Sequence, residues 1–243
     1  MISCFLSLFF VYLFKSNFMA DKLLQLRAAE KKAELLFLAI QDRKLLKVGI
    51  SEEELNKLIF DLAEEMFGVI KYWHKRIVRS GKNTLMPYRE NPPNLLLESD
   101  DIVFFDFGPV FEEWEADFGR TYVIGDCKRK IKLKNDIESA WWDGKRFYDL
   151  NKNDLTGADL YFFTKNLAEK YGWEFGNKHC GHIIGEFPHE KIQGESSLNY
   201  IQPNNHQLLS ANDQHGNERF WIYEVHFIDR RHEIGGFFEQ LIS

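Results

Sequence analysis

Apolar residues recur at every third or fourth position in several stretches of the chain, a spacing typical of amphipathic helices. Four segments are expected to be helical on this basis or from their end signals: 21–46, 52–66, 135–151 and 156–171. Ser51 and Glu54 match a capping box at the start of the second helix, since the Ser51 hydroxyl can accept from the Glu54 amide while the Glu54 carboxylate reaches back. Gly172 is expected to close the fourth helix.

Between the helices the pattern changes to that of strands. Residues 101–108 carry large apolar side chains on both faces, which predicts a strand buried on both sides. Residues 116–124 are its expected hairpin partner, and residues 71–78 are rich in β-forming types. With the turn centred in 110–113, a symmetric register places Asp106 opposite Asp117.

The last third of the chain alternates short strands with polar loops. Residues 221–228 and 234–242 predict a second hairpin, in which a turn near Arg231 and His232 makes Glu224 face Glu239. No internal repeat or low-complexity linker divides the chain, so a single α+β domain is the expected fold class.

Composition narrows the function classes. The 243 residues include 44% hydrophobic and 15% aromatic residues, enough for a sizeable core, and this excludes a disordered chain. The net charge of −6 and the absence of a long basic tract argue against a nucleic-acid partner. Three cysteines, none in a CxxC pair, fit a reducing compartment, so we expect a cytoplasmic protein.

Residues 1–18 differ from the rest of the chain because they are almost wholly apolar up to Phe14. The apolar run is shorter than the roughly 20 residues that span a bilayer, and it lacks the flanks of a signal peptide. Met19 opens a charged amphipathic segment. We therefore expect 1–18 to be an upstream extension or a mispredicted start, residues 19–243 to form the folded domain, and no stable membrane association.

Four acidic residues stand out because the two predicted hairpins bring them into facing pairs: Asp106, Asp117, Glu224 and Glu239. Facing carboxylates repel unless a cation lies between them. His182, between glycines in the segment 181–185, supplies a nitrogen ligand, and His189 follows. Oxygen-rich ligands of this kind suit two divalent ions, with Mn²⁺ or Co²⁺ preferred and Fe²⁺ or Zn²⁺ as further options.

Each element of this pattern has an ordinary structural explanation. Asp106 alone fits a strand-end aspartate that caps a turn or pairs with an arginine. Glu224 and Glu239 alone fit solvent-facing glutamates of an edge hairpin, and a single histidine is more often a packed residue than a ligand. His226 lies on the same strand face as Glu224. It could support the neighbouring site residues or simply pack in the core, and the sequence favours neither interpretation.

Together, these motifs resemble those of the pita-bread metallopeptidases, which include methionine aminopeptidase, aminopeptidase P and prolidase. The resemblance is carried by DIVFFDFG (101–108), DFGRT (117–121) and GHIIG (181–185) with His189, followed by Glu224 and Glu239 in the family's order. It covers about residues 20–243. It implies the pita-bread (creatinase/aminopeptidase) fold, with an antiparallel sheet core flanked by helices in a single domain.

The resemblance also implies roles for the individual residues. Asp106 would bind one metal ion, Asp117 and Glu239 would bridge two, and His182 with Glu224 would hold the other. Glu224 would also move a proton from the attacking water to the leaving amine. His189 would be catalytic and substrate-binding, donating a hydrogen bond to the scissile carbonyl or to the oxyanion that forms from it.

Relatives carry a substrate-binding histidine before the first aspartate strand, and this chain departs from them there. Tyr88 falls at or beside that position, which makes it an expected substrate-binding residue, whereas His74 aligns too early in the chain. Val225 replaces a proline found in many relatives. These differences affect the expected substrate rather than the expected metal ligands.

The expected function is that of a dinuclear metal-dependent exopeptidase that hydrolyses the N-terminal bond of a peptide substrate. The His-Glu ending of residues 181–190 favours an Xaa-Pro aminopeptidase or dipeptidase. Alternatives are a methionine aminopeptidase, a non-catalytic peptide- or protein-binding member, and a metal-independent hydrolase of the creatinase kind. We allow for a homodimer.

Overall fold

The computed structural model describes residues 2–86, 88–189, 196–213 and 215–243, with the backbone alone described for residues 2–20 and 196. Its α-helices are α1 (Ile2–Asp42), α2 (Glu52–Phe67), α3 (Lys128–Asn151) and α4 (Gly157–Tyr171). All four predicted helices are present, although α1 and α3 begin earlier than their apolar spacing indicated. Within the described residues no helix is both long enough and apolar enough to cross a membrane. The nature of residues 1–18 stays a prediction, because their side chains lie outside the described part.

The helix ends follow from local sequence. Ser51 Oγ accepts a hydrogen bond from the Glu54 amide at 3.1 Å, as predicted, but the expected return contact of the Glu54 carboxylate with the Ser51 amide is not among the contacts of the described residues. Thr156 and Asp159 form a full reciprocal capping box at the start of α4. Gly172 closes α4 in a left-handed conformation, with φ of 82°, which a glycine adopts without steric cost.

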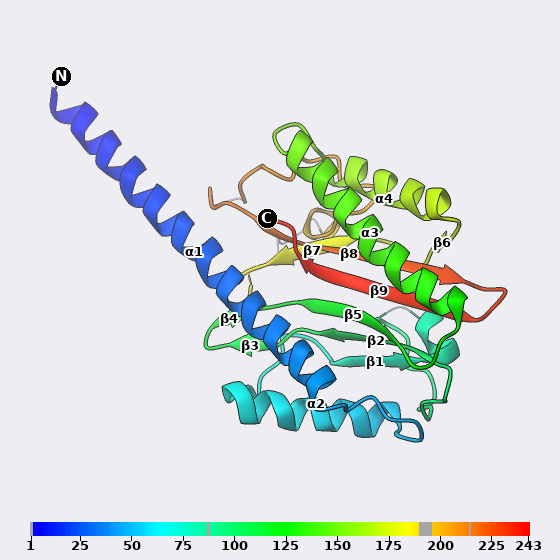
Figure 1. Cartoon of the computed structure of the whole chain (residues 1–243). Helices are drawn as coiled ribbons and strands as arrows, with labels where there is room; N and C mark the ends of the chain where they lie inside the picture. Colours follow the sequence, from blue (N-terminus) through cyan, green and yellow to red (C-terminus); the bar gives the residue numbers. More distant parts are fainter. Residues whose placement is uncertain (1, 87, 190–195, 214) are drawn as a thin grey trace.

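Seven strands form one antiparallel sheet in the order β1-β2-β5-β9-β8-β6, with β7 also paired to β8 (Figure 1). Their bounds are β1 (Ile77–Ser80), β2 (Ile102–Phe107), β5 (Phe118–Val123), β6 (Glu174–Phe175), β7 (Gly181–Ile184), β8 (Phe220–Asp229) and β9 (Ile234–Leu241). The short hairpin β3 (Val110–Phe111) and β4 (Trp114–Glu115) lies between β2 and β5 in sequence. Two 3-10 turns complete the elements: η1 (Gly81–Leu85) and η2 (Ser196–Asn199).

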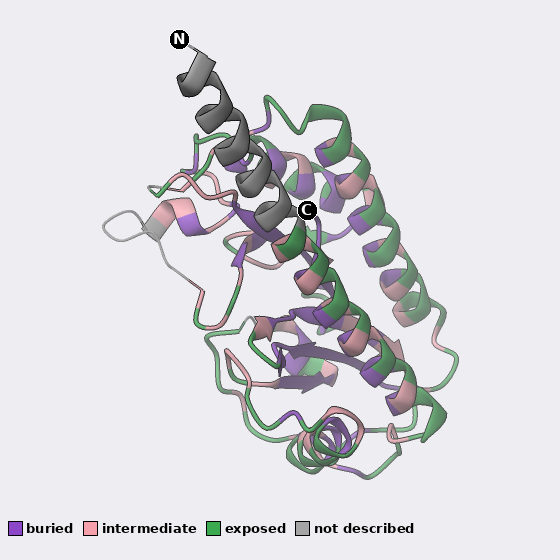
Figure 2. Ribbon diagram, turned by 90° about the vertical axis from the view of Figure 1, so that its left-hand side faces the viewer, coloured by how far each residue is buried: buried purple, intermediate pink, exposed green. Residues whose placement is uncertain are grey.

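The sheet has two halves, each with its own apolar core. In the first half α1 and α2 pack on β1, β2 and β5, and in the second half α3 and α4 pack on β7, β8 and β9. Figure 1 shows α2 at the opposite end of the domain from α3 and α4, with α1 running diagonally past the sheet toward α2. Figure 2 shows buried residues along the strands and on the helix sides turned toward them. The face of the sheet that the helices leave uncovered is therefore available for a site.

Period-two alternation decides which side chains reach that uncovered face. In β2 the residues Val103, Phe105 and Phe107 pack against α1 and α2, so Asp106 points to the other side. In β8 the residues Tyr223 and Val225 join the core formed with α3 and α4, so Glu224 also points away from the helices. Polar residues that interrupt apolar strands thus converge on one face.

The register confirms one predicted pair and corrects the other. Glu224 pairs directly with Glu239. Asp106 pairs with Gly119, not with Asp117, so the predicted register is wrong by two residues. The turn is centred between Glu112 and Glu113, because β3 and β4 extend the hairpin. A shift of two residues preserves the face of the sheet, so Asp117 still lies on the same side as Asp106.

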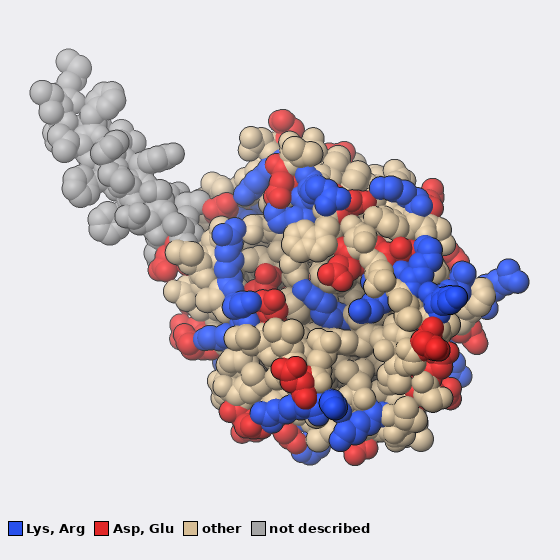
Figure 3. Space-filling model, viewed as in Figure 1, with Lys and Arg blue, Asp and Glu red and all other residues tan. Residues whose placement is uncertain are grey.

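Residues 71–78 were expected to be β-rich, but the strand that pairs with β2 is β1, which begins only at Ile77. The preceding residues form a segment that contacts the ends of β2 and β5, with Tyr72 bridging to Pro109. On the face drawn in Figure 3, acidic and basic side chains are interspersed rather than gathered by sign.

Candidate metal centre

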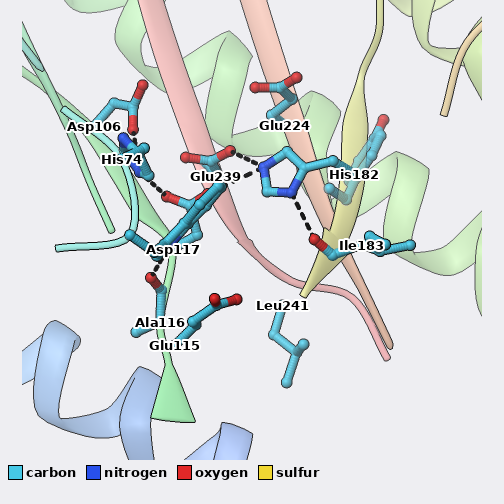
Figure 4. A network of polar contacts seen from close by, with 12 residues as sticks. His74, Asp106, Glu115, Ala116, Asp117, His182, Ile183, Glu224, Glu239 and Leu241 are labelled. Atoms are coloured by element: carbon cyan, nitrogen blue, oxygen red, sulfur yellow. Dashed lines mark hydrogen bonds and ion pairs between the residues drawn. The ribbon is translucent and has the colours of Figure 1, made fainter. Parts of the chain in front are cut away.

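A cluster of carboxylates and imidazoles lies where the two halves of the sheet meet (Figure 4). The pairing of β5 with β9 consists of the single pair Gly119 and Glu239. A Cβ on Gly119 would lie 2.5 Å from the Phe237 ring, so glycine is required for this close approach. The expected residues Asp106, Asp117, Glu224 and Glu239 are all buried, with exposed fractions between 2% and 8%.

Asp117 occupies the centre of the cluster, between two histidines. Its Oδ1 lies 3.1 Å from His74 Nε2, and its Oδ2 lies 3.1 Å from His182 Nε2. His74 Nε2 is also 3.5 Å from Asp106 Oδ1, and His182 Nε2 is 3.7 Å from Glu239 Oε1. Asp117 therefore joins two groups of donor atoms, as a bridging carboxylate does.

His182 is held by β7 through a very close backbone contact. A Cβ on Gly181 would lie 2.1 Å from the Ile222 carbonyl oxygen, and the φ of Gly181 is 148°. His182 Nδ1 lies 3.0 Å from the Ile183 carbonyl oxygen, to which it can only donate, and this contact directs Nε2 toward the carboxylates. Position 181 therefore requires a glycine, because any side chain there would clash with the Ile222 carbonyl group.

Glu224 and Glu239 differ in their contacts although they face each other. Glu224 Oε1 forms an ion pair with His179 Nδ1 and accepts from Asn177 Nδ2 at 3.4 Å. Its carboxylate is not among the two compact donor groups that the structure brings together. Glu239 Oε2 is buried and has no hydrogen-bond partner among the described residues.

Burial and like charge set opposing protonation preferences within the cluster. Burial raises the pKa of Asp106 to about 7, although the charge of His74 opposes the shift. Burial would also raise the pKa of Asp117, but the charges and hydrogen bonds of His74 and His182 outweigh it and lower this pKa to about 2. Burial and the charge of Asp117 hold the pKa of Glu239 well above its usual range.

The histidines respond in the opposite direction. Burial disfavours the charged form of His74, but the charges of Asp117 and Asp106 raise its pKa to about 9. The pKa of His182 is likewise raised well above its usual value, because hydrogen bonds and charges of Asp117 and Glu239 overcome burial. Protons thus compensate in part for an excess of buried negative charge.

The donor set fits divalent cations. The ligand atoms of His74, Asp106 and Asp117 all lie within 4.8 Å of one another, as do those of Asp117, His182 and Glu239. Buried carboxylates are costly unless paired or bound to a cation. The unpartnered Glu239 oxygen is one position that a cation would satisfy. These residues could therefore hold two ions that share Asp117.

His189 lies beside the cluster and is oriented by a buried carboxylate. Its Nδ1 is 2.7 Å from Glu115 Oε2, and its backbone amide donates to Glu115 Oε1 at 3.2 Å. The Trp73 ring lies 5.2 Å from the His182 ring and 5.4 Å from the His189 ring, centre to centre, so it stands next to both. His189 Nε2 is not engaged by Glu115 and is left for another group.

Tyr88 is 44% exposed, and its ring centre lies 5.6 Å from that of His74. The structure therefore places Tyr88 at the edge of the cluster and His74 inside it, although His74 aligned too early to be the family's histidine. A cavity of about 470 Å³ adjoins His189 and is lined in part by Trp114 and Phe187. The expectation drawn from the His-Glu ending involves Glu190, which lies outside the described residues.

Sequence reasoning missed two residues of this site, His74 as part of the carboxylate cluster and Glu115 as the partner of His189. No spacing motif identifies either residue. Glu115 is an acidic residue among aromatic neighbours, and it is buried in the structure. For His74 the signal is Gly108, because only a glycine leaves room for the His74 ring. His226 is explained by packing: it is buried, and its Nε2 lies 2.9 Å from the Thr84 carbonyl oxygen.

Proteins with similar sequences include peptidases. A Xaa-Pro dipeptidase from Pyrococcus horikoshii is 27% identical over 127 residues, which are 52% of this chain and 35% of the relative. The chain spans about half or less of the length of the first curated relatives it matches.

Solved structures share the fold. The X-Pro aminopeptidase from Thermotoga maritima superposes with a TM-score of 0.72 at 20% identity, covering 90% of this chain and 57% of that one. Methionine aminopeptidase from Rickettsia prowazekii gives a TM-score of 0.67 at 19% identity, covering 91% and 92%. At these identities the likeness shows the fold alone, which is the predicted pita-bread α+β fold.

The family model of metallopeptidase family M24 (Peptidase_M24) matches residues 25–225. This range includes Asp106, Asp117, His182 and Glu224, and Glu239 follows it in the paired strand β9. The chain belongs to metallopeptidase family M24, a family of metal-dependent peptidases.

Proposed function

We propose that this protein is an exopeptidase that uses two divalent metal ions to hydrolyse the N-terminal peptide bond of its substrate. The observation that carries the proposal is the position of Asp117, whose two oxygens each lie 3.1 Å from a different histidine nitrogen in a buried carboxylate cluster. The residues of such a site would hold two cations with Asp117 as the shared carboxylate.

The proposed metal ligands are those expected from the sequence: Asp106, Asp117, His182, Glu224 and Glu239. Bound divalent ions would polarise the substrate carbonyl and lower the pKa of water toward neutrality. Mn²⁺ or Co²⁺ is our preferred metal, with Fe²⁺ or Zn²⁺ as the next choices. For Glu224 to act as a ligand, its carboxylate must turn from His179 toward Glu239, its partner across the β-ladder.

The protein groups around the cluster have separate tasks in the proposed reaction. The Glu224 carboxylate takes a proton from the attacking water and returns it to the leaving amine nitrogen. His189, fixed through Nδ1 by Glu115, uses Nε2 to donate a hydrogen bond to the carbonyl oxygen as negative charge develops there. Tyr88, at the exposed edge, contacts the substrate.

An Xaa-Pro substrate is our first choice, supported by the similarity to Xaa-Pro dipeptidases. The second candidate is a methionine aminopeptidase. A specific observation favours it: the chain is 28% identical over 109 residues to a methionine aminopeptidase from Rickettsia prowazekii. A cytoplasmic location and a homodimer stay predictions.

The test combines metal content with peptide hydrolysis on one sample. Protein stripped with a chelator is reloaded with Mn²⁺ or Co²⁺, analysed for metal per chain, and given Xaa-Pro and Met-Xaa peptides in parallel. An N-acetylated peptide of the same sequence is the control, because an aminopeptidase needs a free amino terminus.

Two metal ions per chain and release of the first residue only from unblocked peptides support the proposal. The cleaved peptide then distinguishes the two substrate classes. Absence of metal binding and turnover would contradict the proposal and favour a non-catalytic peptide-binding member of the family.

A further inference from the structure

His74 is held in the carboxylate cluster by the residue before it. The Trp73 amide donates to the Gly108 carbonyl oxygen at 2.9 Å, and Trp73 Nε1 donates to the Ala116 carbonyl oxygen at 3.0 Å. Gly108 directly follows β2, and Ala116 precedes β5. These two contacts present His74 between the ends of the strands that carry Asp106 and Asp117.

Gly108 provides the space for the imidazole. A Cβ at this position would lie 2.3 Å from His74 Cδ2 and 2.4 Å from His74 Nε2. Any larger residue would therefore displace the ring. The exposed fraction of the His74 side chain is 7%, so the ring is enclosed by protein.

The orientation of His74 matches that of His182. In His74 the Nδ1 atom lies 2.7 Å from the Lys75 carbonyl oxygen, and in His182 the Nδ1 atom lies 3.0 Å from the Ile183 carbonyl oxygen. Each ring thus uses the carbonyl of the next residue to fix Nδ1 and directs Nε2 at one oxygen of Asp117. A hydrogen bond from the second ring nitrogen to a backbone carbonyl is how proteins orient metal-binding histidines.

A histidine that only forms an ion pair with Asp117 would also lie at this distance. Two observations favour a ligand. His74 Nε2 lies near oxygens of two aspartates at once, at 3.1 Å and 3.5 Å. The same cluster contains the buried Glu239 Oε2, which has no partner among the described residues and shows that the cluster is not satisfied by its own contacts.

We propose that His74 is an additional metal ligand, whose Nε2 joins Asp106 and Asp117 in holding the first of the two ions. The inference rests on the proposed dinuclear site and extends its ligand set. Each ion then has one imidazole, from His74 or His182, besides carboxylates, and Asp117 is shared. An imidazole at both positions moves the preference away from Mg²⁺-like ions and toward Co²⁺, Fe²⁺ or Zn²⁺.

The test measures metal binding rather than peptide hydrolysis. Chelator-stripped full-length protein is titrated with Co²⁺ by calorimetry, and X-ray absorption of the loaded protein counts imidazole ligands per ion. Wild type is compared with His74→Ala and with His232→Ala. The matched control removes a histidine whose side chain is 44% exposed and bonded to Asp229, outside the cluster.

For wild type and His232→Ala we expect two ions per chain, and X-ray absorption should show imidazole on both ions. For His74→Ala we expect one equivalent to bind at least about 100-fold more weakly, and one imidazole should be lost from the absorption spectrum. The inference would be overturned if His74→Ala bound two Co²⁺ ions per chain with wild-type affinity and the number of imidazole ligands per ion did not change. Binding of fewer than two ions by wild type and by the control would instead contradict the proposed dinuclear function.

Circular dichroism and thermal unfolding check that the variant folds. If His74→Ala does not fold, His74→Gln replaces it, because the longer amide side chain fills the space beside Gly108. Imidazole nitrogen NMR of wild type with Zn²⁺ answers the question without any variant: a shift of His74 Nε2 on addition of metal supports the inference, and an unchanged His74 signal with two ions bound overturns it.

Discussion

Glu115 Oε2 lies 2.7 Å from Nδ1 of His189, and the same carboxylate accepts from the backbone amides of His189 and Gly185. The side chain of Glu115 is 1% exposed. A buried carboxylate with three donors in one short loop fixes both the loop and the ring. His189, in the loop that follows β7, is therefore positioned by a residue from β4.

Replacing Glu115 should weaken catalysis without removing metal. If His189 acts on the carbonyl oxygen as proposed, His189→Ala should lower kcat by about 10²–10⁴-fold. Glu115→Gln should lower it by at least about 10-fold, because the ring loses its charged partner. The exposed Glu113→Gln is the matched control. An unchanged kcat in Glu115→Gln would show that His189 does not need this carboxylate.

Asp117 should be the most sensitive ligand. Asp117→Ala removes both oxygens that face His74 and His182, so both ions and all peptidase activity should be lost. Metal analysis after reloading with Mn²⁺ or Co²⁺ is the measurement. Asp61→Ala, which removes an exposed aspartate paired with Lys57, should keep both. Wild-type turnover by Asp117→Ala would refute the site.

Tyr88 should affect substrate binding and leave the metal in place. Its exposed ring at the edge of the site offers about 1–2 kcal/mol of apolar contact to a substrate, so Tyr88→Ala should raise KM about 5- to 30-fold. Metal content and kcat should stay near wild type. A fall in metal content with no change in KM would assign Tyr88 to the cluster instead of the substrate.

Arg120 joins the two halves of the sheet from behind the site. Its guanidinium donates to the carbonyl oxygens of Gly119 at 2.7 Å and Glu239 at 2.8 Å, between the rings of Phe118 and Phe238. Arg120→Lys cannot reproduce this planar set of contacts. It should lower the free energy of unfolding by about 2–3 kcal/mol, seen as a fall in Tm of roughly 5–10 °C. Lys165→Arg, on exposed α4 surface, should leave Tm unchanged.

Glu30 should make stability depend on pH away from the metal centre. Burial raises the pKa of Glu30 to about 7, although the Leu241 amide donates to its carboxylate and Arg120 lies nearby. The folded state therefore binds the proton more tightly than the unfolded state. Its contribution to stability is complete below about pH 4.5 and is lost as the pH rises to about 7.

Urea unfolding at several pH values, compared between wild type and Glu30→Gln, measures this effect. The amide can still accept from Leu241, so the variant keeps the contact and loses the titration. Wild type should lose stability relative to Glu30→Gln between pH 4.5 and 7. If the free energy of unfolding changed with pH in the same way in both proteins, Glu30 would not be the titrating group.

The sequence was sufficient for features that depend on local spacing. The pair Glu224 and Glu239 was predicted because the turn near Arg231 is symmetric and its strands alternate regularly. The pairing of β2 with β5 was also predicted, but its register was not. Glu112 adopts a φ of 60° at the hairpin turn, and residues 110–115 contain no glycine or asparagine that would signal where such a turn is centred.

Features that depend on distant segments were not predicted. His74 reaches the cluster because Trp73 binds the backbone at both Gly108 and Ala116, contacts that no local pattern encodes. Glu115 looked like one of several glutamates in an acidic turn, and only its burial distinguishes it from its exposed neighbours. The family resemblance assigned roles to the five expected ligands, but it gave none to His74, which aligned too early in the chain to match the family's histidine.

The pairing of Gly119 with Glu239 joins a first part of the sheet (β1, β2 and β5) to a second part (β6 to β9), and Leu26 of α1 also packs on Ile222 and Leu241 of the second part. The first part carries His74, Asp106 and Asp117, whereas His182 and Glu239 come from the second. One donor group is therefore complete before the second part of the polypeptide has been synthesised, and the other forms only when both parts have docked. If the proposed dinuclear site is correct, two fragments made by cutting the chain between β5 and α3 should take up the second metal ion only on reassembly.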